Sequence, residues 1–180
     1  MRNPRIEELF AGLARSAGLQ GLIRSLEQTA GVAEKPARRL SGLTLTAKAA
    51  YAALLYRATG RPLVLVVDGN KQAEALFPAI GTFSGLLDVT QPPLLVPALD
   101  VLPGQAMSPH ADILAARAEA FDRLSNGQAG IVVMPVAAAL TRVNPPEYYR
   151  QLTLTLRLHE EIPLDDLSSH LESIGYERHD

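Results

Sequence analysis

The sequence predicts an α/β protein built on a parallel sheet. Three short apolar runs, at residues 63–67, 94–97 and 130–134, are separated by longer segments with helical periodicity. Strands that alternate with helices at this spacing are typical of βαβ units. The run at 63–67 contains only Leu and Val and lies between Pro62 and Asp68. We therefore expect it to be a strand buried on both faces, as strands of parallel sheets usually are.

The first 38 residues predict a helical arm and a linker. Between residues 5 and 28, apolar side chains recur at helical spacing on both sides of Gly18, which indicates two short amphipathic helices. The stretch from Ala30 to Arg39 contains Gly31 and Pro36 and has no period. We expect the arm to pack on the main body, which we place at residues 39–150.

Helical patterns fill the spaces between the predicted strands. The expected helices span 46–59, 70–83 and about 108–125, with a short helix opening at Pro135 and closing near 144–146. Pro78 should disturb the second of these, because proline removes a hydrogen bond from a helix interior. For the third helix, Ser108 has the chemistry of an N-cap and Pro109 that of a first helical residue.

The C-terminal part predicts the opening of a second, smaller α+β domain at residues 151–180. Leucines alternate with polar residues in a way that predicts a half-exposed strand, and a helix with an apolar face and a stop at Gly175 follows. The leucines of the strand are Leu152, Leu154, Leu156 and Leu158, and the inward residues of the helix are Leu164, Leu167, Leu171 and Ile174. We expect the chain to be cut from a longer polypeptide and this domain to be incomplete, with the lowest hydrogen-exchange protection of the fragment.

Composition excludes several classes of function. The chain has 17 basic and 19 acidic residues and a net charge of −2, so no overall field draws it to nucleic acid. The densest basic group, Lys35 with Arg38 and Arg39, reads as a solvated linker. The absence of cysteine excludes disulfides and thiolate metal sites. No apolar run reaches the roughly 18 residues of a membrane span, so we expect a cytoplasmic protein without a membrane partner.

The segment 42–49 is the most informative motif, because it matches half of a phosphate-binding loop. A working loop, G-x-x-x-x-G-K-[ST], wraps backbone N–H groups around phosphates. Its lysine binds the negative charge of the β- and γ-phosphates, and its Ser or Thr hydroxyl binds Mg²⁺. Here Gly42 and Lys48 remain, but Ala47 replaces the second glycine and Ala49 the hydroxyl residue. We interpret the loop as degenerate, with Gly42, Thr44, Thr46 and Lys48 as its relic and no cofactor bound by this fragment.

The remaining polar residues predict neither a catalytic nor a metal site. His110 and Asp112 lie at a helix start, where capping explains them, and Asp68 can end a strand and cap the next helix. Asp165 and Asp166 fit the first turn of a helix in the same way. His159, His170 and His179 lack metal-ligand spacing and read as surface residues. No Asp-Glu pair follows the strand at 131–134, where an ATPase would hold Mg²⁺ and water.

Taken in order, these pieces resemble the N-terminal, UvrB-like module of bacterial transcription-repair coupling factors (Mfd), over about residues 40–180. The pieces are the loop at 42–49, the stretches 96–103 and 108–113 with Arg117, the stretch 130–136, the turn at 145–148 and the closing residues 171–176. The chain departs from the family at Leu99-Asp100, where an aromatic residue and Glu are usual, and at Gly104, where an aromatic residue is common.

The resemblance implies a RecA-like, P-loop-NTPase-like lobe, similar to UvrB domain 1a, that has lost its ATPase residues and serves as a docking and autoregulatory module. The whole polypeptide would be an ATP- and Mg²⁺-dependent translocase of helicase superfamily 2, acting on double-stranded DNA in nucleotide excision repair. It would displace stalled RNA polymerase and recruit UvrA, the latter through the second domain and mostly through chain beyond Asp180. The fragment would also contact the rest of its own chain.

Two alternatives remain open at this stage. In the first, the fragment is a working nucleotide-binding lobe of a UvrB-like helicase or excision-nuclease subunit, with Lys48 and helix N–H groups still holding ATP. In the second, the fragment is an unrelated α/β binding protein. Enzymatic activity is thus undecided by sequence, although the degenerate loop favours none in this part of the chain.

Overall fold

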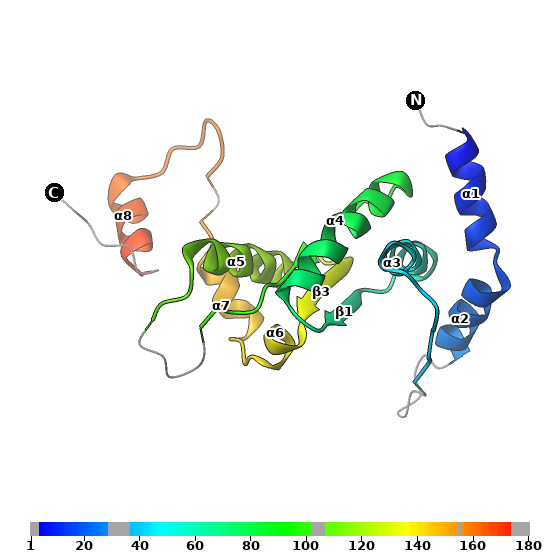
Figure 1. Cartoon of the computed structure of the whole chain (residues 1–180). Helices are drawn as coiled ribbons and strands as arrows, with labels where there is room; N and C mark the ends of the chain where they lie inside the picture. Colours follow the sequence, from blue (N-terminus) through cyan, green and yellow to red (C-terminus); the bar gives the residue numbers. More distant parts are fainter. Residues whose placement is uncertain (1–3, 29–36, 102–106, 155, 174–180) are drawn as a thin grey trace.

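The computed structural model describes residues 4–28, 37–101, 107–154 and 156–173 (Figure 1). Three strands and eight helices alternate over most of this length, in agreement with the predicted α/β class. The elements are α1 (Pro4–Ala14), α2 (Ala17–Gln28), α3 (Leu45–Thr59), β1 (Leu63–Val67), α4 (Asn70–Leu86), β2 (Leu94–Leu95), α5 (Ala111–Ser125), β3 (Ile131–Pro135), α6 (Val136–Leu140), α7 (Pro146–Gln151) and α8 (Leu164–Ser173).

The sheet is parallel, with the strand order β1-β3-β2. In β1, Leu63 pairs with Ile131 and Val67 with Pro135, while Leu94 of β2 pairs with Val132. The last strand in the sequence therefore lies in the centre. β2 is only two residues long, which is shorter than the apolar run at 94–97 predicts. The Val96 N–H still donates to the Val133 carbonyl, but the next N–H on that side, that of Ala98, donates to the Asn70 side chain instead of β3.

Helices α3 and α4 cover one face of the sheet (Figure 1). Small residues allow them to lie close to the strands: Ala49 and Ala73 are completely buried beside Ile131 and Val133 of β3. The side chains of Leu63, Leu65 and Val67 pack into the same cluster. The cover is complete over β3, whereas the same side chains of β1 are only half-buried.

Helices α5 and α6 cover the other face only in part. Leu94, Ala120, Val132 and Ala138 are buried together there, so β3 is buried on both sides, as the sequence predicts. β1 is not: Val64 and Val66, which point to this face, are 58% and 53% exposed. The prediction that 63–67 is buried on both faces is wrong, because β1 is an edge strand that the packing of α5 and α6 on β2 and β3 leaves uncovered.

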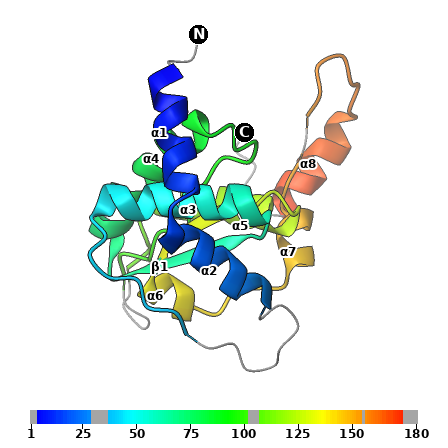
Figure 2. The same cartoon turned by 90° about the vertical axis from the view of Figure 1, so that its right-hand side faces the viewer.

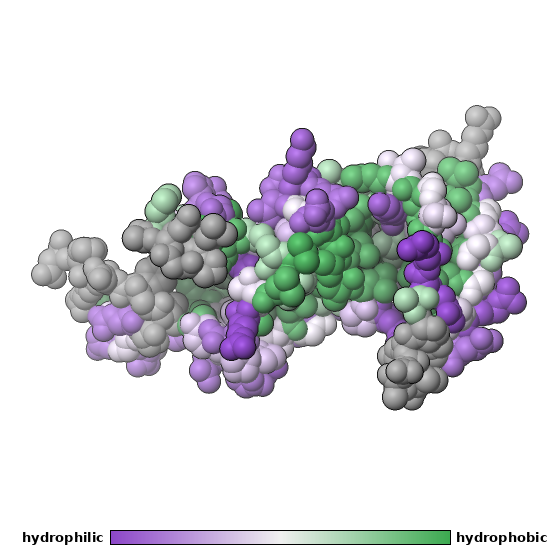
Figure 3. All heavy atoms as spheres, turned by 60° about the horizontal axis from the view of Figure 1, so that its bottom comes forward, coloured by the Kyte–Doolittle hydropathy of each residue, from purple (hydrophilic) through white to green (hydrophobic). Residues whose placement is uncertain are grey.

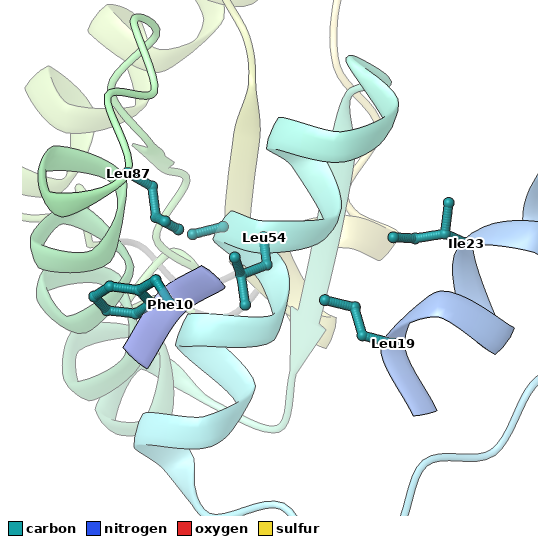
Figure 4. Close-up of a cluster of buried hydrophobic side chains, with 6 residues drawn as sticks. Phe10, Leu19, Ile23, Leu54 and Leu87 are labelled. Atoms are coloured by element: carbon teal, nitrogen blue, oxygen red, sulfur yellow. The ribbon is translucent and has the colours of Figure 1, made fainter. Parts of the chain in front are cut away.

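The predicted helical arm is present as α1 and α2, which cross α3 on its outer side (Figure 2). Phe10, Leu19 and Ile23 are buried against Leu54 of α3 and Leu87 (Figure 4). The rings of Phe10 and Phe83 meet edge to face at 5.7 Å, which joins α1 to α4. The break falls at residues 15–16, just before Gly18.

Two helix boundaries differ from the sequence-based expectation. α4 continues through Pro78, because Pro78 and Glu74 lie on its exposed side, where water can bind the Glu74 carbonyl that the proline leaves free. α5 begins at Ala111 with His110 as its N-cap, and Ser108 does not cap it. The cause is Asp100, whose carboxylate accepts a hydrogen bond from the His110 backbone N–H at 3.2 Å and holds that residue outside the helix.

The predicted strand at 152–158 is wrong for the described residues of that segment. They form turns and irregular chain after α7, and Leu158 is 89% exposed. α8 follows at the end of the molecule opposite α1, with Leu164 exposed rather than inward (Figure 1). Ile174 and Gly175 lie outside the described residues, and so does Gly104. No described helix is both long and apolar enough to cross a membrane.

Candidate functional site

The segment 42–48, interpreted from the sequence as a relic phosphate-binding loop, runs directly into the first turn of α3. α3 begins at Leu45, and the hydroxyl oxygen of Thr44 accepts a hydrogen bond from the Ala47 N–H at 3.2 Å. The N–H of Lys48 donates to the Thr44 carbonyl at 2.9 Å. In a working loop these backbone donors point at phosphates. Here the chain itself occupies both of them.

The four relic residues do not converge on one point. Gly42 keeps the left-handed backbone (φ +75°) that glycine allows, but the described residues before it, 37–41, form no strand. Thr46 and Lys48 lie exposed on α3, two positions apart, and residues at this spacing do not face each other on a helix. A phosphate placed beside Lys48 would thus meet a helix side rather than a loop.

The carboxyl end of a parallel sheet is where ligands usually bind, and here side chains of the chain fill it. Asn70, which follows Gly69 shortly after β1, makes two hydrogen bonds to the backbone of Ala98, one as acceptor and one as donor. Its side-chain oxygen accepts from the Ala98 N–H at 2.9 Å, and its side-chain nitrogen donates to the Ala98 carbonyl at 3.3 Å. This pair of bonds fixes the chain after β2 to the start of α4.

Arg117 of α5 holds the same segment from the other side. The side chain is only 8% exposed, and its Nη1 donates to the Pro97 carbonyl at 2.7 Å. Its guanidinium carbon lies 5.1 Å from the ring centre of Phe121. Burial lowers the pKa of Arg117, opposed by the nearby Tyr149, yet an arginine remains charged at neutral pH. We name Asn70, Arg117 and the backbone of Pro97 and Ala98 the carboxyl-end clamp.

The other polar residues serve local structure. The His110 ring accepts from the Asp112 N–H at 3.3 Å, so the capping interpretation of this pair is confirmed. Asp68 ends β1, but its predicted cap on the next helix is wrong: Gly69 is the N-cap of α4, and the Gln72 side chain accepts from the Asp68 N–H. Within the described ranges, no three His, Asp or Glu residues gather to hold a metal ion.

Sequence reasoning missed the carboxyl-end clamp. Arg117 is a lone charge on the stripe of α5 that carries Ala120 and Phe121, and such a residue must either snorkel or find an internal acceptor. Asn70 follows a strand and a glycine, where an amide side chain commonly bonds nearby backbone. Both signals exist in the sequence, but neither identifies the partner.

Comparison with known proteins bears out the resemblance. No protein-family model matches the chain. Over 141 residues, 78% of its length, the chain is 29% identical to a transcription-repair-coupling factor of Bacillus subtilis. It is 27% identical over 139 residues to that of Escherichia coli, and 30% identical over 82 residues to that of Haemophilus influenzae. The matched parts cover 12% of the first two proteins and 7% of the third. The chain is thus similar to transcription-repair-coupling factors over most of its length and spans only a small fraction of theirs.

Proposed function

We propose that this chain is a docking and autoregulatory module of a transcription-repair coupling factor, and that it performs no catalysis of its own. The similarity to coupling factors over three quarters of the chain supports the family part of this proposal. The state of the relic loop supports the second part. The N–H of Ala47 is capped by Thr44, and that of Lys48 is bonded within α3, so these two donors are already occupied and do not point at a phosphate.

The closed carboxyl end supports the same view. In an open α/β sheet a substrate would enter the crevice beyond the strand ends, and Asn70 and Arg117 tie down the chain that borders this crevice. β3 ends at Pro135 and is followed by Val136 of α6, and neither residue carries a carboxylate to position Mg²⁺ or water. A RecA-like lobe that keeps its shape for docking explains these features together.

The wider role follows from the resemblance and belongs to the longer polypeptide. A separate motor would bind ATP and Mg²⁺ and move on double-stranded DNA in the cytoplasm to displace stalled RNA polymerase. The UvrB-like region that begins with this chain would recruit UvrA and hold the motor in check through intramolecular contacts. Contacts with the rest of the polypeptide would account for the exposure of Val64 and Val66 at one edge of the sheet. Figure 3 shows a broad hydrophobic surface across the middle of the lower side of the molecule.

Calorimetric titration with ATP and Mg²⁺ tests the non-catalytic part. We expect no saturable heat up to millimolar ATP for the chain or for its Lys48→Ala variant. Such a result would mean that any ATP binding is worth less than about 4 kcal/mol of free energy. Lys71→Ala, an exposed lysine at the start of α4, is the matched control for loss of one charge. Saturable binding that Lys48→Ala removes and Lys71→Ala keeps would instead support a working UvrB-like nucleotide lobe.

The docking part needs the longer protein. We expect Lys48→Ala to leave displacement of stalled RNA polymerase unchanged there, whereas deletion of residues 1–180 should weaken UvrA recruitment, by removing the start of the second domain, and alter the ATPase rate of the motor. A pull-down with UvrA and a steady-state ATPase assay measure both effects. UvrA recruitment and motor rate that are both unchanged by the deletion would refute the docking and autoregulatory role.

A further inference from the structure

Helix α5 ends in an Asn-Gly dipeptide, a sequence that is chemically prone to deamidation. Asn126 is the C-cap of the helix, and both Asn126 and Gly127 are exposed to solvent. In an unfolded chain the backbone nitrogen of a following glycine attacks the Asn side chain readily, because glycine has no Cβ to hinder the approach. The reaction needs no enzyme and no cofactor, only water.

The fold holds both reacting groups of this dipeptide in hydrogen bonds. The Asn126 side-chain nitrogen donates to the Asp122 carbonyl at 3.0 Å and to the Asp122 carboxylate at 3.1 Å. The Gly127 N–H, which must lose its proton to react, donates to the Leu124 carbonyl at 3.1 Å. The Asn126 ψ of 8° also turns the Gly127 nitrogen toward the nitrogen of Asn126 itself and away from its Cβ. The reaction therefore requires this turn to open first.

Helix α7 and Thr153, which lies just beyond it, hold the same turn of α5. The Thr153 hydroxyl donates to the Asp122 carboxylate at 2.6 Å, on the same oxygen that accepts the Asn126 side chain. The Nε of Arg150 in α7 donates to the Ser125 carbonyl at 3.0 Å. One aromatic ring of each helix completes the contact, with 4.9 Å between the ring centres. We name α7 together with Thr153 the α7 strap.

We propose that Asn126 is a site of spontaneous deamidation whose rate is set by release of the α7 strap from α5. Once the turn is open, the Gly127 nitrogen loses its proton and bonds to the side-chain carbonyl carbon of Asn126. The bond from that carbon to the side-chain nitrogen breaks, and this nitrogen leaves with the proton as ammonia. Water then hydrolyses the cyclic imide at either of its carbonyls, which gives aspartate or isoaspartate.

Either product weakens the turn from which it forms. A carboxylate at position 126 loses both donors to Asp122 and places a second negative charge beside that residue. The new charge also lies at the C-terminal end of α5, where the helix dipole disfavours it. Isoaspartate adds a methylene to the backbone and displaces the cap bond from the Gln128 N–H to the Arg123 carbonyl. Release of the α7 strap therefore persists after the reaction, whether or not the chain acts in docking.

Incubation of the chain at neutral pH, followed by electron-transfer mass spectrometry that distinguishes isoaspartate from aspartate, tests the proposal. A synthetic peptide of residues 120–132 gives the rate without the fold. We expect Asn126 in the chain to react more than about tenfold more slowly than in the peptide, because only the open fraction reacts. Asn144 is an internal control, since Pro145 has no N–H that could form the imide. Equal rates at Asn126 in chain and peptide would overturn the proposal.

Thr153→Val tests the α7 strap itself, because it removes the hydroxyl bonded to Asp122 and nearly keeps the side-chain volume. We expect deamidation of Asn126 to become about fivefold faster, the effect of losing one hydrogen bond. Arg150→Met, which removes the second bond of the strap, should act in the same direction. Thr82→Val, which removes an exposed hydroxyl bonded within α4, is the matched control and should leave the rate unchanged. If both strap variants fold, as read by circular dichroism, and react no faster than the control, the gating by the strap is refuted.

Discussion

The carboxyl end of the sheet and the outer edge of β1 differ in whether the chain's own side chains cover and bond them. At the carboxyl end, the backbone beyond β2 is held by side chains, two bonds from Asn70 and one from Arg117. Along β1, the outward backbone and the side chains of Val64 and Val66 are left exposed. The backbone beyond β2 is thus satisfied within this chain, whereas the side chains of Val64 and Val66 stay in contact with solvent.

Loss of the Arg117 guanidinium should have the largest effect on the first region. Arg117→Met keeps much of the apolar stem but removes the donor to Pro97 and the contact with Phe121. We expect the free energy of unfolding to fall by about 2–4 kcal/mol, measured by urea denaturation. A loss below about 1 kcal/mol would mean that the carboxyl end does not depend on this residue.

Asn70→Ala should have the next largest effect, because it leaves the N–H and C=O of Ala98 without their partners. We expect a loss of about 1–3 kcal/mol in unfolding free energy. Gln72→Ala, which removes an exposed single bond to the Asp68 N–H, is the matched control and should cost under about 1 kcal/mol. Equal effects of the two substitutions would contradict the special role of Asn70.

A substitution at Gly130 tests how tightly the Tyr56 ring packs at the amino end of β3. A Cβ there would lie 2.8 Å from the Tyr56 ring, whose hydroxyl donates to Gln91. Gly130→Ala should therefore cost about 1–2 kcal/mol through displacement of that ring. Gly85→Ala in α4, where a Cβ has open space, should instead stabilise by about 0.5–1 kcal/mol. Thermal unfolding measures both, and a stabilised Gly130→Ala would show that the ring moves freely.

The open edge should give the smallest effects in the 180-residue chain. Val64→Thr changes a side chain that is 58% exposed, and we expect a change within about 0.5 kcal/mol. Val132→Thr places the same hydroxyl on the same face of buried β3 and should cost about 1–3 kcal/mol. Similar losses from both, by urea denaturation, would mean that β1 is already covered.

The sequence predicted elements better than it predicted their surroundings. Periodicity placed α1 to α5 and the strands β1 and β3 within a few residues, because local apolar spacing determines such elements. The exposure of Val64 was missed because a continuous apolar run looks the same at an edge as in the centre. The strand at 152–158 failed because alternating leucines form a strand only beside a partner, and α5 and α7 offer none.

The features of the candidate site also fall into those that residue types predict and those that depend on the tertiary structure. The mismatch of Ala47 with a phosphate-loop glycine can be read from residue types alone, whereas the N-cap of α5 was assigned to Ser108 rather than to His110. The early start of α3, which turns the Ala47 N–H onto Thr44, depends on the geometry of one hydrogen bond. The carboxyl-end clamp joins positions 20 and 28 residues apart, and such pairings are set by the strand order rather than by local sequence.

The central position of β3 also governs how this chain is made. Leu63 pairs with Ile131, 68 positions later, and β1 and β2 do not pair with each other. During synthesis both outer strands must therefore wait, unpaired and apolar, until β3 has left the ribosome, at a rate of roughly 5–20 residues per second. That delay of several seconds is the period in which the nascent chain is most prone to aggregate and most in need of a chaperone.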